Sequence, residues 1–356
     1  MPTIASDSTE SPHGFNIERI VHSIKTALAC LIGFSITKLS MLHLDQWLVI
    51  TIIVVMCAQI NVGSVLNKAS MRFLGTLSGS ILAALTLAIF GANPIAIGTM
   101  IVLSAAIFSY VATSDSSYSD AGTLGAVTVV IILINQHPTV FVATHRFFEI
   151  SFGILLAALF SQFIFPIHAR DHLRRMQAKT IKQMRNYYIA SLITHTTEQA
   201  TEEYEEIDEN IVASLSSQRA LAKQSSREAF GEQFNHDKFS RLLHCEKEIF
   251  RSIVCMRYAT DMLPTKRDML LNLAAVKNFN QSICDALDRI SPAIELNQFA
   301  GHTFDIPSVQ ALKDALAAAK KTMPEDDIIY MNGFLFCAEL LVVQLTQLVI
   351  LLEKNK

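Results

Sequence analysis

Six long apolar segments follow one another in the first half of the chain, and they constrain its fold more than any other feature. They cover residues 19–38, 46–61, 72–90, 95–113, 119–135 and 147–165, separated by short polar joints. A helix needs roughly 17 to 25 mostly apolar residues to cross a bilayer. Any one segment alone could be a buried core helix, but six in succession with very few charges favour six transmembrane helices.

The charged residues are divided unevenly, which predicts the domain organisation. Only 13 of the 61 charged residues precede Pro166, and the other 48 follow it. We therefore expect an all-α membrane protein with a transmembrane domain at 18–166 and a cytoplasmic helical domain at 167–356. Residues 1–17 are polar and lack the pattern of a signal peptide, so we interpret them as a disordered tail. The net charge of −3 gives no support for nucleic-acid binding.

The orientation follows from lysine and arginine residues in the short flanks of the spans, which collect on the cytoplasmic side. If both termini are cytoplasmic, only Lys38 and Arg146 lie on the outer side. The inner side then receives Arg19, Lys25, Lys68, Arg72 and the basic cluster 170–185. The sequence thus predicts a multi-pass protein of the bacterial inner membrane with cytoplasmic N- and C-termini.

A sequence repeat with a shift of 74 residues relates the two halves of the membrane segment. RFLGTLSGSILAAL at 72–85 matches RFFEISFGILLAAL at 146–159, and Ile60-Asn61 matches Ile134-Asn135. Three spans separate the copies, so the second copy would enter the membrane from the opposite face. This arrangement is the inverted-topology repeat common in secondary transporters. The alternative is chance similarity between two Leu/Ala-rich helices.

The second and fifth segments are the shortest and least regular. Each ends at an asparagine, Asn61 or Asn135, with Gly-Ser or His-Pro close behind. Interrupted segments at matching positions of two halves indicate a transport site, because unpaired backbone at membrane depth needs protein or a water-filled cavity around it. We therefore regard Asn61 and Asn135 as candidate substrate-binding residues.

Three short motifs, in order, carry a family resemblance. They are WLVIT at 47–51, RFLGTLSG at 72–79, and a last span from Arg146 through Gly153 to Phe165-Pro166. Together they resemble the fusaric acid resistance protein-like (FUSC) family, which includes aromatic acid exporters and is similar to aluminium-activated malate transporters. The resemblance covers residues 18–166, although the SDSSYSDAG segment is more acidic and Ser-rich than the family pattern.

The resemblance implies efflux of small aromatic or amphipathic organic acids across the inner membrane, driven by an ion gradient. Because some relatives carry two six-span halves, a homodimer is expected; the other partners considered are the lipid bilayer, the organic anion and a periplasmic adaptor protein. Two alternatives stay open. The chain could be a passive organic-anion channel, or a membrane scaffold whose cytoplasmic helical domain binds a partner protein.

Small residues four positions apart recur in the third and sixth spans. Gly75 and Gly79 form GxxxG, and Gly153 and Ala157 are the counterpart. Small residues at this spacing let helix backbones approach closely inside lipid. We predict that these four residues serve helix packing.

Cations near the ends of spans are candidate contacts for an anionic substrate. Arg72 and Arg146 begin the third and sixth predicted spans, on opposite faces, and Lys25 lies within the first turns of the first span. Each arginine could instead snorkel, with its stem in lipid and its charge in water. A lysine facing lipid at mid-depth costs roughly 2.5–3.5 kcal/mol, which favours a functional contact.

Three further residues have two interpretations each. Glu149 lies three residues after Arg146 and could form a local ion pair, or could exchange protons in an antiport cycle. Trp47 could be an interfacial anchor or a platform for a ligand, and we expect the anchor. Thr51, one turn deeper, could bind a substrate carboxylate or its own backbone.

The second half reads as amphipathic helices, at about 209–228, 237–262, 266–290, 307–321 and 325–353 after a long basic run. The segment 331–352 is long enough to span a membrane, but Glu339, Gln344 and Gln347 interrupt it, so we expect a buried helix of the cytoplasmic bundle. No phosphate-binding loop or nucleophile elbow occurs. We therefore expect no enzymatic activity, no cofactor and no metal site.

Overall fold

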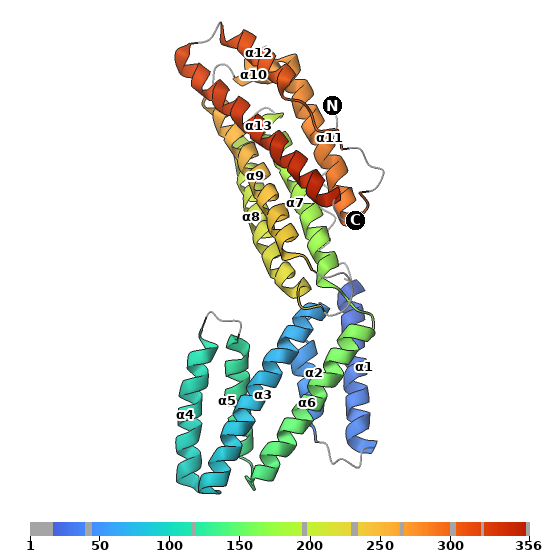
Figure 1. The fold of residues 1–356 in the computed structure, drawn as a ribbon, viewed down its shortest axis with the longest axis vertical. Helices are drawn as coiled ribbons and strands as arrows, with labels where there is room; N and C mark the ends of the chain where they lie inside the picture. Colours follow the sequence, from blue (N-terminus) through green and yellow to red (C-terminus); the bar gives the residue numbers. More distant parts are fainter. Residues whose placement is uncertain are drawn as a thin grey trace. The chain divides into compact units, whose positions relative to one another are not determined.

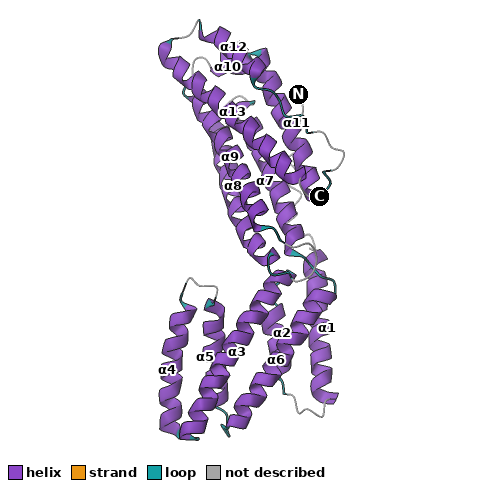
Figure 2. Cartoon of the chain, viewed as in Figure 1, coloured by secondary structure: helices purple, strands orange, loops and turns teal. Residues whose placement is uncertain are grey.

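The computed structural model describes residues 17–39, 45–114, 118–193, 198–228, 234–263, 267–299, 304–321 and 324–353. All of its regular secondary structure in these ranges is helical, as Figure 2 shows, which confirms the all-α prediction. The chain divides into two compact units. The first holds the described residues up to Ala169 together with Arg227 and Glu228, and the second holds the remainder from Arg170 onward. Residues 1–16 of the predicted tail lie outside the described residues, and Ile17 is the first residue of a helix.

The first unit contains six helices. In chain order they are α1 (Ile17–Leu39), α2 (Trp47–Met56), α3 (Val62–Phe90), α4 (Pro94–Ala112), α5 (Ser119–Leu133) and α6 (Val140–Phe163). Four of these, α1, α3, α4 and α6, are long and apolar enough to cross a membrane, and α2 and α5 are shorter apolar helices. The expectation that the second and fifth segments form the short helices is therefore confirmed.

The helix contacts of the first unit are related by the same 74-residue shift as the sequence. Helix α1 packs on α2 as α4 packs on α5, and α3 packs on α5 as α6 packs on α2. Helices α3 and α6 lie side by side and run in opposite directions, as Figure 1 shows. Their contact includes Phe73 and its repeat counterpart Phe147, with ring centroids 5.8 Å apart.

Two helices begin earlier than predicted. Helix α3 starts at Val62 instead of residue 72, and α6 starts at Val140 instead of residue 147. The polar sequence predicts a joint over residues 62–71, but these residues form the first turns of α3. The segment holds no proline that would break a helix, and its Lys68 pairs with Asp120 at 3.3 Å. The Thr139 side chain caps α6 by accepting a hydrogen bond from the backbone N–H of Val142 at 3.3 Å, since Pro138 ends the preceding loop.

The second unit is a helical bundle around one apolar core. Its helices are α7 (Ala169–Leu192), α8 (Glu198–Ser225), α9 (His236–Asp261), α10 (Arg267–Asn272), α11 (Ala274–Leu296), α12 (Gln310–Lys320) and α13 (Glu325–Glu353). The predicted single helix at 266–290 is two helices, because the chain leaves helical geometry at Leu273.

Helix α13 is the fifth helix long and apolar enough to cross a membrane. In the structure it packs along α9 and contributes Phe334, Leu341 and Leu345 to the core of the second unit. Another part of the helix is exposed, including Phe336, Val343 and Ile350, so its placement in a cytoplasmic bundle stays a prediction.

A carboxyl group lies buried in the core of the second unit. Glu246 of α9 is 1% exposed, and its Oε2 accepts a hydrogen bond from Nε2 of Gln218 at 2.7 Å. Gln218 also donates to Thr180 Oγ1 at 3.1 Å, which joins α7, α8 and α9. Burial raises the pKa of Glu246 from 4.5 to about 8, although the hydrogen bond from Gln218 lowers it.

Replacing Glu246 with glutamine should stabilise the protein relative to the wild type, by an amount that grows as the pH rises. The folded state holds the Glu246 proton up to about pH 8 whereas the unfolded chain loses it near pH 4.5, so wild-type stability falls as the pH rises through this window. The Glu246→Gln variant should lack this loss and should melt at a higher temperature at pH 7 to 8. Thermal unfolding followed by circular dichroism between pH 5 and pH 9 measures the difference. An exposed control on α8, Glu209→Gln, should keep the wild-type pH dependence; equal profiles for all three proteins would contradict the assignment.

Candidate functional site

A stripe of polar side chains runs along the buried face of α3. Arg72, Thr76 and Ser80 follow one another at four-residue intervals, which places them on one face of the helix. They are 3%, 0% and 6% exposed. Within the described part of the chain, Nε of Arg72, Oγ1 of Thr76 and Oγ of Ser80 have no hydrogen-bond partner. Unpaired buried donors are costly in an apolar medium, so this stripe can accept a polar ligand.

Arg72 is not at the end of its span, which corrects the sequence prediction. It lies ten residues after the first residue of α3, about 15 Å along the helix axis, and Thr76 is the central residue of α3. Its guanidinium has no acidic partner among the described residues. The Arg72 side chain is covered by neighbouring helices and is 3% exposed, whereas a snorkelling arginine would extend its guanidinium into water.

Lys25 is a second buried cation in the first unit. It is 1% exposed, and its Nζ has no hydrogen-bond partner within the described ranges. One turn earlier on α1, His22 is also buried, and its Nε2 lies 3.1 Å from the backbone carbonyl oxygen of Met56. Lys25 and Arg72 are thus two buried cations of this unit for which no described carboxylate lies within ion-pair distance.

The opposite situation holds at Arg146. Its Nη1 donates to Asp45 Oδ2 at 3.2 Å and to Glu149 Oε2 at 2.7 Å, and its guanidinium lies 5.4 Å from the ring centroid of Trp47. Glu149 is fully buried and accepts a hydrogen bond from the backbone N–H of Asp45 at 2.5 Å. His145 Nδ1 lies 3.6 Å from Glu149 Oε1. Arg146 is therefore neutralised by two acids, unlike its repeat counterpart Arg72.

Glycines bring the helices around the stripe into close contact. A Cβ atom at Gly75 would lie 2.6 Å from the backbone oxygen of Ala121, and one at Gly79 would lie 2.6 Å from that of Gly125. Only glycine permits such approaches. These crossings join α3 to α5 beside the polar stripe.

The repeat-related crossing joins α6 to α2. A Cβ atom at Gly153 would lie 2.8 Å from the Leu48 backbone oxygen and 2.9 Å from Cβ of Thr51. Thr51 is fully buried, and its Oγ1 has no hydrogen-bond partner in the described structure. Ala157, one turn after Gly153, is also fully buried in the core of this unit.

The two asparagines lie at helix boundaries. Asn61 is the N-cap residue of α3, and its backbone oxygen accepts hydrogen bonds from the N–H groups of Ser64 and Val65 at 3.1 and 3.0 Å. Asn135 follows α5, and its Oδ1 accepts a hydrogen bond from the backbone N–H of His137 at 3.2 Å. Both support local backbone turns, and a role for either in substrate binding stays a prediction.

Sequence reasoning identified Arg72 but missed Thr76, Ser80 and Asp45. The four-residue spacing of Arg72, Thr76 and Ser80 is visible in the sequence and could have indicated the stripe. Asp45 is 101 residues from Arg146, and no local pattern reports a contact of that separation.

Two comparisons with known proteins show which family the chain belongs to. The sequence profile of the fusaric acid resistance protein family matches residues 19–262. The inner membrane protein YeeA of Escherichia coli strain K12 is 30% identical over 189 residues, which cover 51% of this chain and 52% of that protein. The chain thus matches about half of the length of this relative. Because the family profile spans well over half of the sequence, the chain belongs to the fusaric acid resistance protein family.

Proposed function

We propose that this protein is an inner-membrane exporter of small aromatic or amphipathic carboxylates, driven by an ion gradient. The observation that carries the proposal is the buried guanidinium of Arg72, which has no acidic partner among the described residues and heads the polar stripe with Thr76 and Ser80. A buried cation in a membrane is stabilised by an opposite charge. A substrate carboxylate supplies that charge, and the neighbouring hydroxyls supply hydrogen bonds.

The repeat-related contacts support an alternating-access mechanism. Gly79 contacts Gly125, and the repeat counterparts of these two residues are Gly153 and Thr51. These counterparts also contact each other, so the two crossings are equivalent under the 74-residue repeat. A residue that meets its own counterpart, as Phe73 meets Phe147, lies at a pseudo-two-fold axis. We infer two oppositely inserted three-helix repeats, with a substrate site near the middle of α3 at their interface, as in other repeat-built transporters.

Transport by purified protein in liposomes tests the proposal directly. Vesicles loaded with radiolabelled 4-hydroxybenzoate should release it faster than protein-free vesicles when a proton gradient is imposed. Benzamide, which has a similar ring but no charge, should not compete. No release of any aromatic carboxylate under either direction of the gradient would contradict the proposal.

Replacing Glu149 with glutamine should separate a coupled exporter from a passive channel. Glutamine keeps the shape of the side chain, but it cannot carry a proton through a transport cycle. In a proton-coupled exporter, Glu149→Gln should abolish the acceleration produced by a pH gradient and leave exchange of labelled for unlabelled substrate in place. Flux measured with and without the gradient reports both properties. Unchanged gradient-driven flux would exclude Glu149 from coupling and favour the channel.

The topology has its own test, in a variant without native cysteines. Ala92, in the turn between α3 and α4, and Thr113, at the end of α4, are both exposed in the first unit. For cytoplasmic termini, a membrane-impermeant thiol reagent should label Ala92→Cys in intact cells and Thr113→Cys only after permeabilisation. Labelling of both positions from the same side would contradict the inverted repeat.

A further inference from the structure

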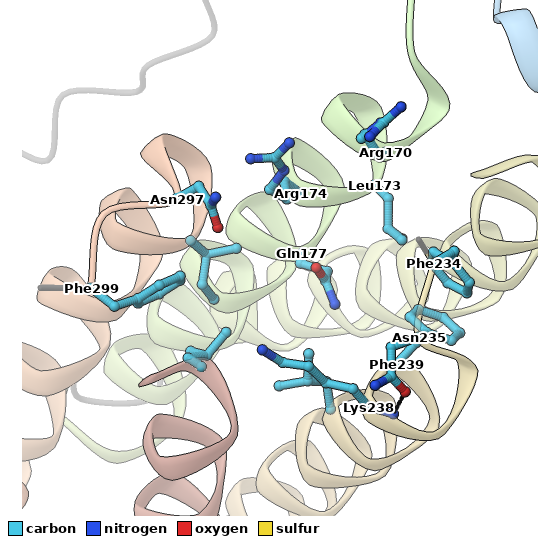
Figure 3. Close-up of a pocket in the computed structure, with 13 residues that line it drawn as sticks. Arg170, Leu173, Arg174, Gln177, Phe234, Asn235, Lys238, Phe239, Asn297 and Phe299 are labelled. Carbon is cyan, nitrogen blue, oxygen red and sulfur yellow. Dashed lines mark hydrogen bonds between the residues drawn. The ribbon is translucent and has the colours of Figure 1, made fainter. Parts of the chain in front are cut away.

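The second unit contains a pocket between the beginning of α7, the beginning of α9 and the end of α11. Its volume is about 160 Å³, comparable to cavities of about 150 Å³ that bind benzene. The apolar floor is formed by Leu173, Leu242, Ile294 and Leu352, which are all buried. Figure 3 shows this pocket and the side chains around it.

Aromatic rings form two walls of the pocket. Phe234 precedes α9 and Phe239 lies in its first turn, while Phe299 follows α11 on the other side, as Figure 3 shows. The chain reaches Phe299 through Asn297, which takes the left-handed conformation with φ of 52° and ends α11. Flat rings on either side of an apolar floor suit a flat aromatic ligand, because aromatic pairs favour offset or edge-to-face contacts.

The polar side chains of the pocket are basic or neutral. Arg170, Arg174 and Lys238 line it, and none of the described lining residues is acidic. Arg174 donates from Nη2 to Asp171 Oδ1 at 2.7 Å, which holds its guanidinium at the edge of the pocket. Gln177, which is 6% exposed, lies in the middle of the pocket between Arg174 and Lys238 in Figure 3. This combination offers charge-assisted hydrogen bonds to an anion.

We propose that this pocket binds a small aromatic monocarboxylate, with its ring between Phe239 and Phe299 and its carboxylate toward Arg174, Lys238 and Gln177. The site lies in the second unit and shares no residue with the polar stripe of α3. It is therefore a second binding site, separate from the proposed transport site, and it would let the helical unit respond to the concentration of such an acid.

Photolabelling of the full-length protein in detergent tests the site. After irradiation with 4-azidobenzoate, peptide mapping by mass spectrometry should find the label in segments 170–177 or 234–242. Unlabelled benzoate should compete, and benzamide should compete about tenfold less well, because it lacks the charge that makes the hydrogen bonds strong. Absence of label from these segments, or equal competition by the two compounds, would overturn the proposal.

Matched arginine variants sharpen the test. Arg174→Gln should raise the benzoate concentration needed for half-competition about tenfold, as expected for loss of one charge-assisted hydrogen bond. Arg185→Gln is the control, because Arg185 lies on the same helix, has the same side-chain exposure of 32% and pairs with Asp288 at 3.0 Å. Equal competition in the two variants would contradict the site. Label in the first unit is read separately and reports only on the proposed transport site.

Discussion

Replacing Arg72 with glutamine should reduce the transport of an aromatic carboxylate by about ten- to a hundredfold. This is the range expected when a charged group loses its hydrogen bonds to an anion. The Arg72 side chain is buried, and no described carboxylate neutralises it, so its charge is available to the substrate. Initial rates in liposomes at a substrate concentration well below saturation measure the loss.

Two further variants show whether the loss is specific. Arg72→Lys keeps the charge but not the planar donor geometry, and should retain part of the activity. The control is Lys68→Gln. Lys68 lies one turn earlier on α3, is partly exposed and pairs with Asp120 at 3.3 Å. The rate of this variant should stay within about twofold of the wild type, since exposed ion pairs contribute little. Full activity of Arg72→Gln would show that the substrate anion does not bind at this residue.

Adding one methyl group at either repeat-related helix crossing should destabilise the first unit by about 1–3 kcal/mol. This is the usual cost of overpacking a core. In Gly79→Ala the new Cβ would meet the Gly125 backbone oxygen at 2.6 Å, and in Gly153→Ala it would meet the Leu48 backbone oxygen at 2.8 Å. Backbone atoms cannot rotate away, so the helices must separate. Thermal unfolding in detergent should show a lower midpoint for both variants.

Gly98 provides the matched control for these two glycines. It lies on α4, where a Cβ atom would meet nothing within 4 Å. Gly98→Ala should not destabilise the unit, and the better helix propensity of alanine should stabilise it by up to about 1 kcal/mol. If Gly79→Ala and Gly153→Ala unfold at the same temperature as Gly98→Ala, the close backbone contacts at Gly79 and Gly153 do not exist in the folded protein.

The helical nature of the chain and the shortness of α2 and α5 were predictable because they depend on local composition. The repeat in the sequence also located the packing glycines Gly79 and Gly153. The position of Arg72 ten residues into α3 was not predictable from hydropathy. The polar residues Asn67 and Lys68 lower the hydropathy of the first turns, so the helix appeared to begin near residue 72. A helix tolerates such residues where neighbouring helices cover them, and hydropathy averages do not contain that information.

Only the part of the candidate site that lies within a single helix could be predicted from the sequence. The stripe of Arg72, Thr76 and Ser80 follows from helical periodicity, whereas the partners of Arg146 do not. Asp45 lies between α1 and α2 and contacts both Arg146 and Glu149 of α6. Because of this contact, the charge of Arg146 is neutralised whereas that of Arg72 is not. Such differences between the halves arise from tertiary packing.

Helices α2 and α5 are shorter than the hydrocarbon layer of a bilayer is thick, so bilayer thickness should affect the proposed transport. Their 10 and 15 residues extend about 15 and 22 Å, whereas the hydrocarbon layer is about 30 Å thick. Lipids with shorter acyl chains reduce this mismatch, and lipids with longer chains increase it. Reconstitution in a series of phosphatidylcholines should therefore alter the rate of the proposed transport, while a soluble ligand of the second unit binds with the same affinity throughout.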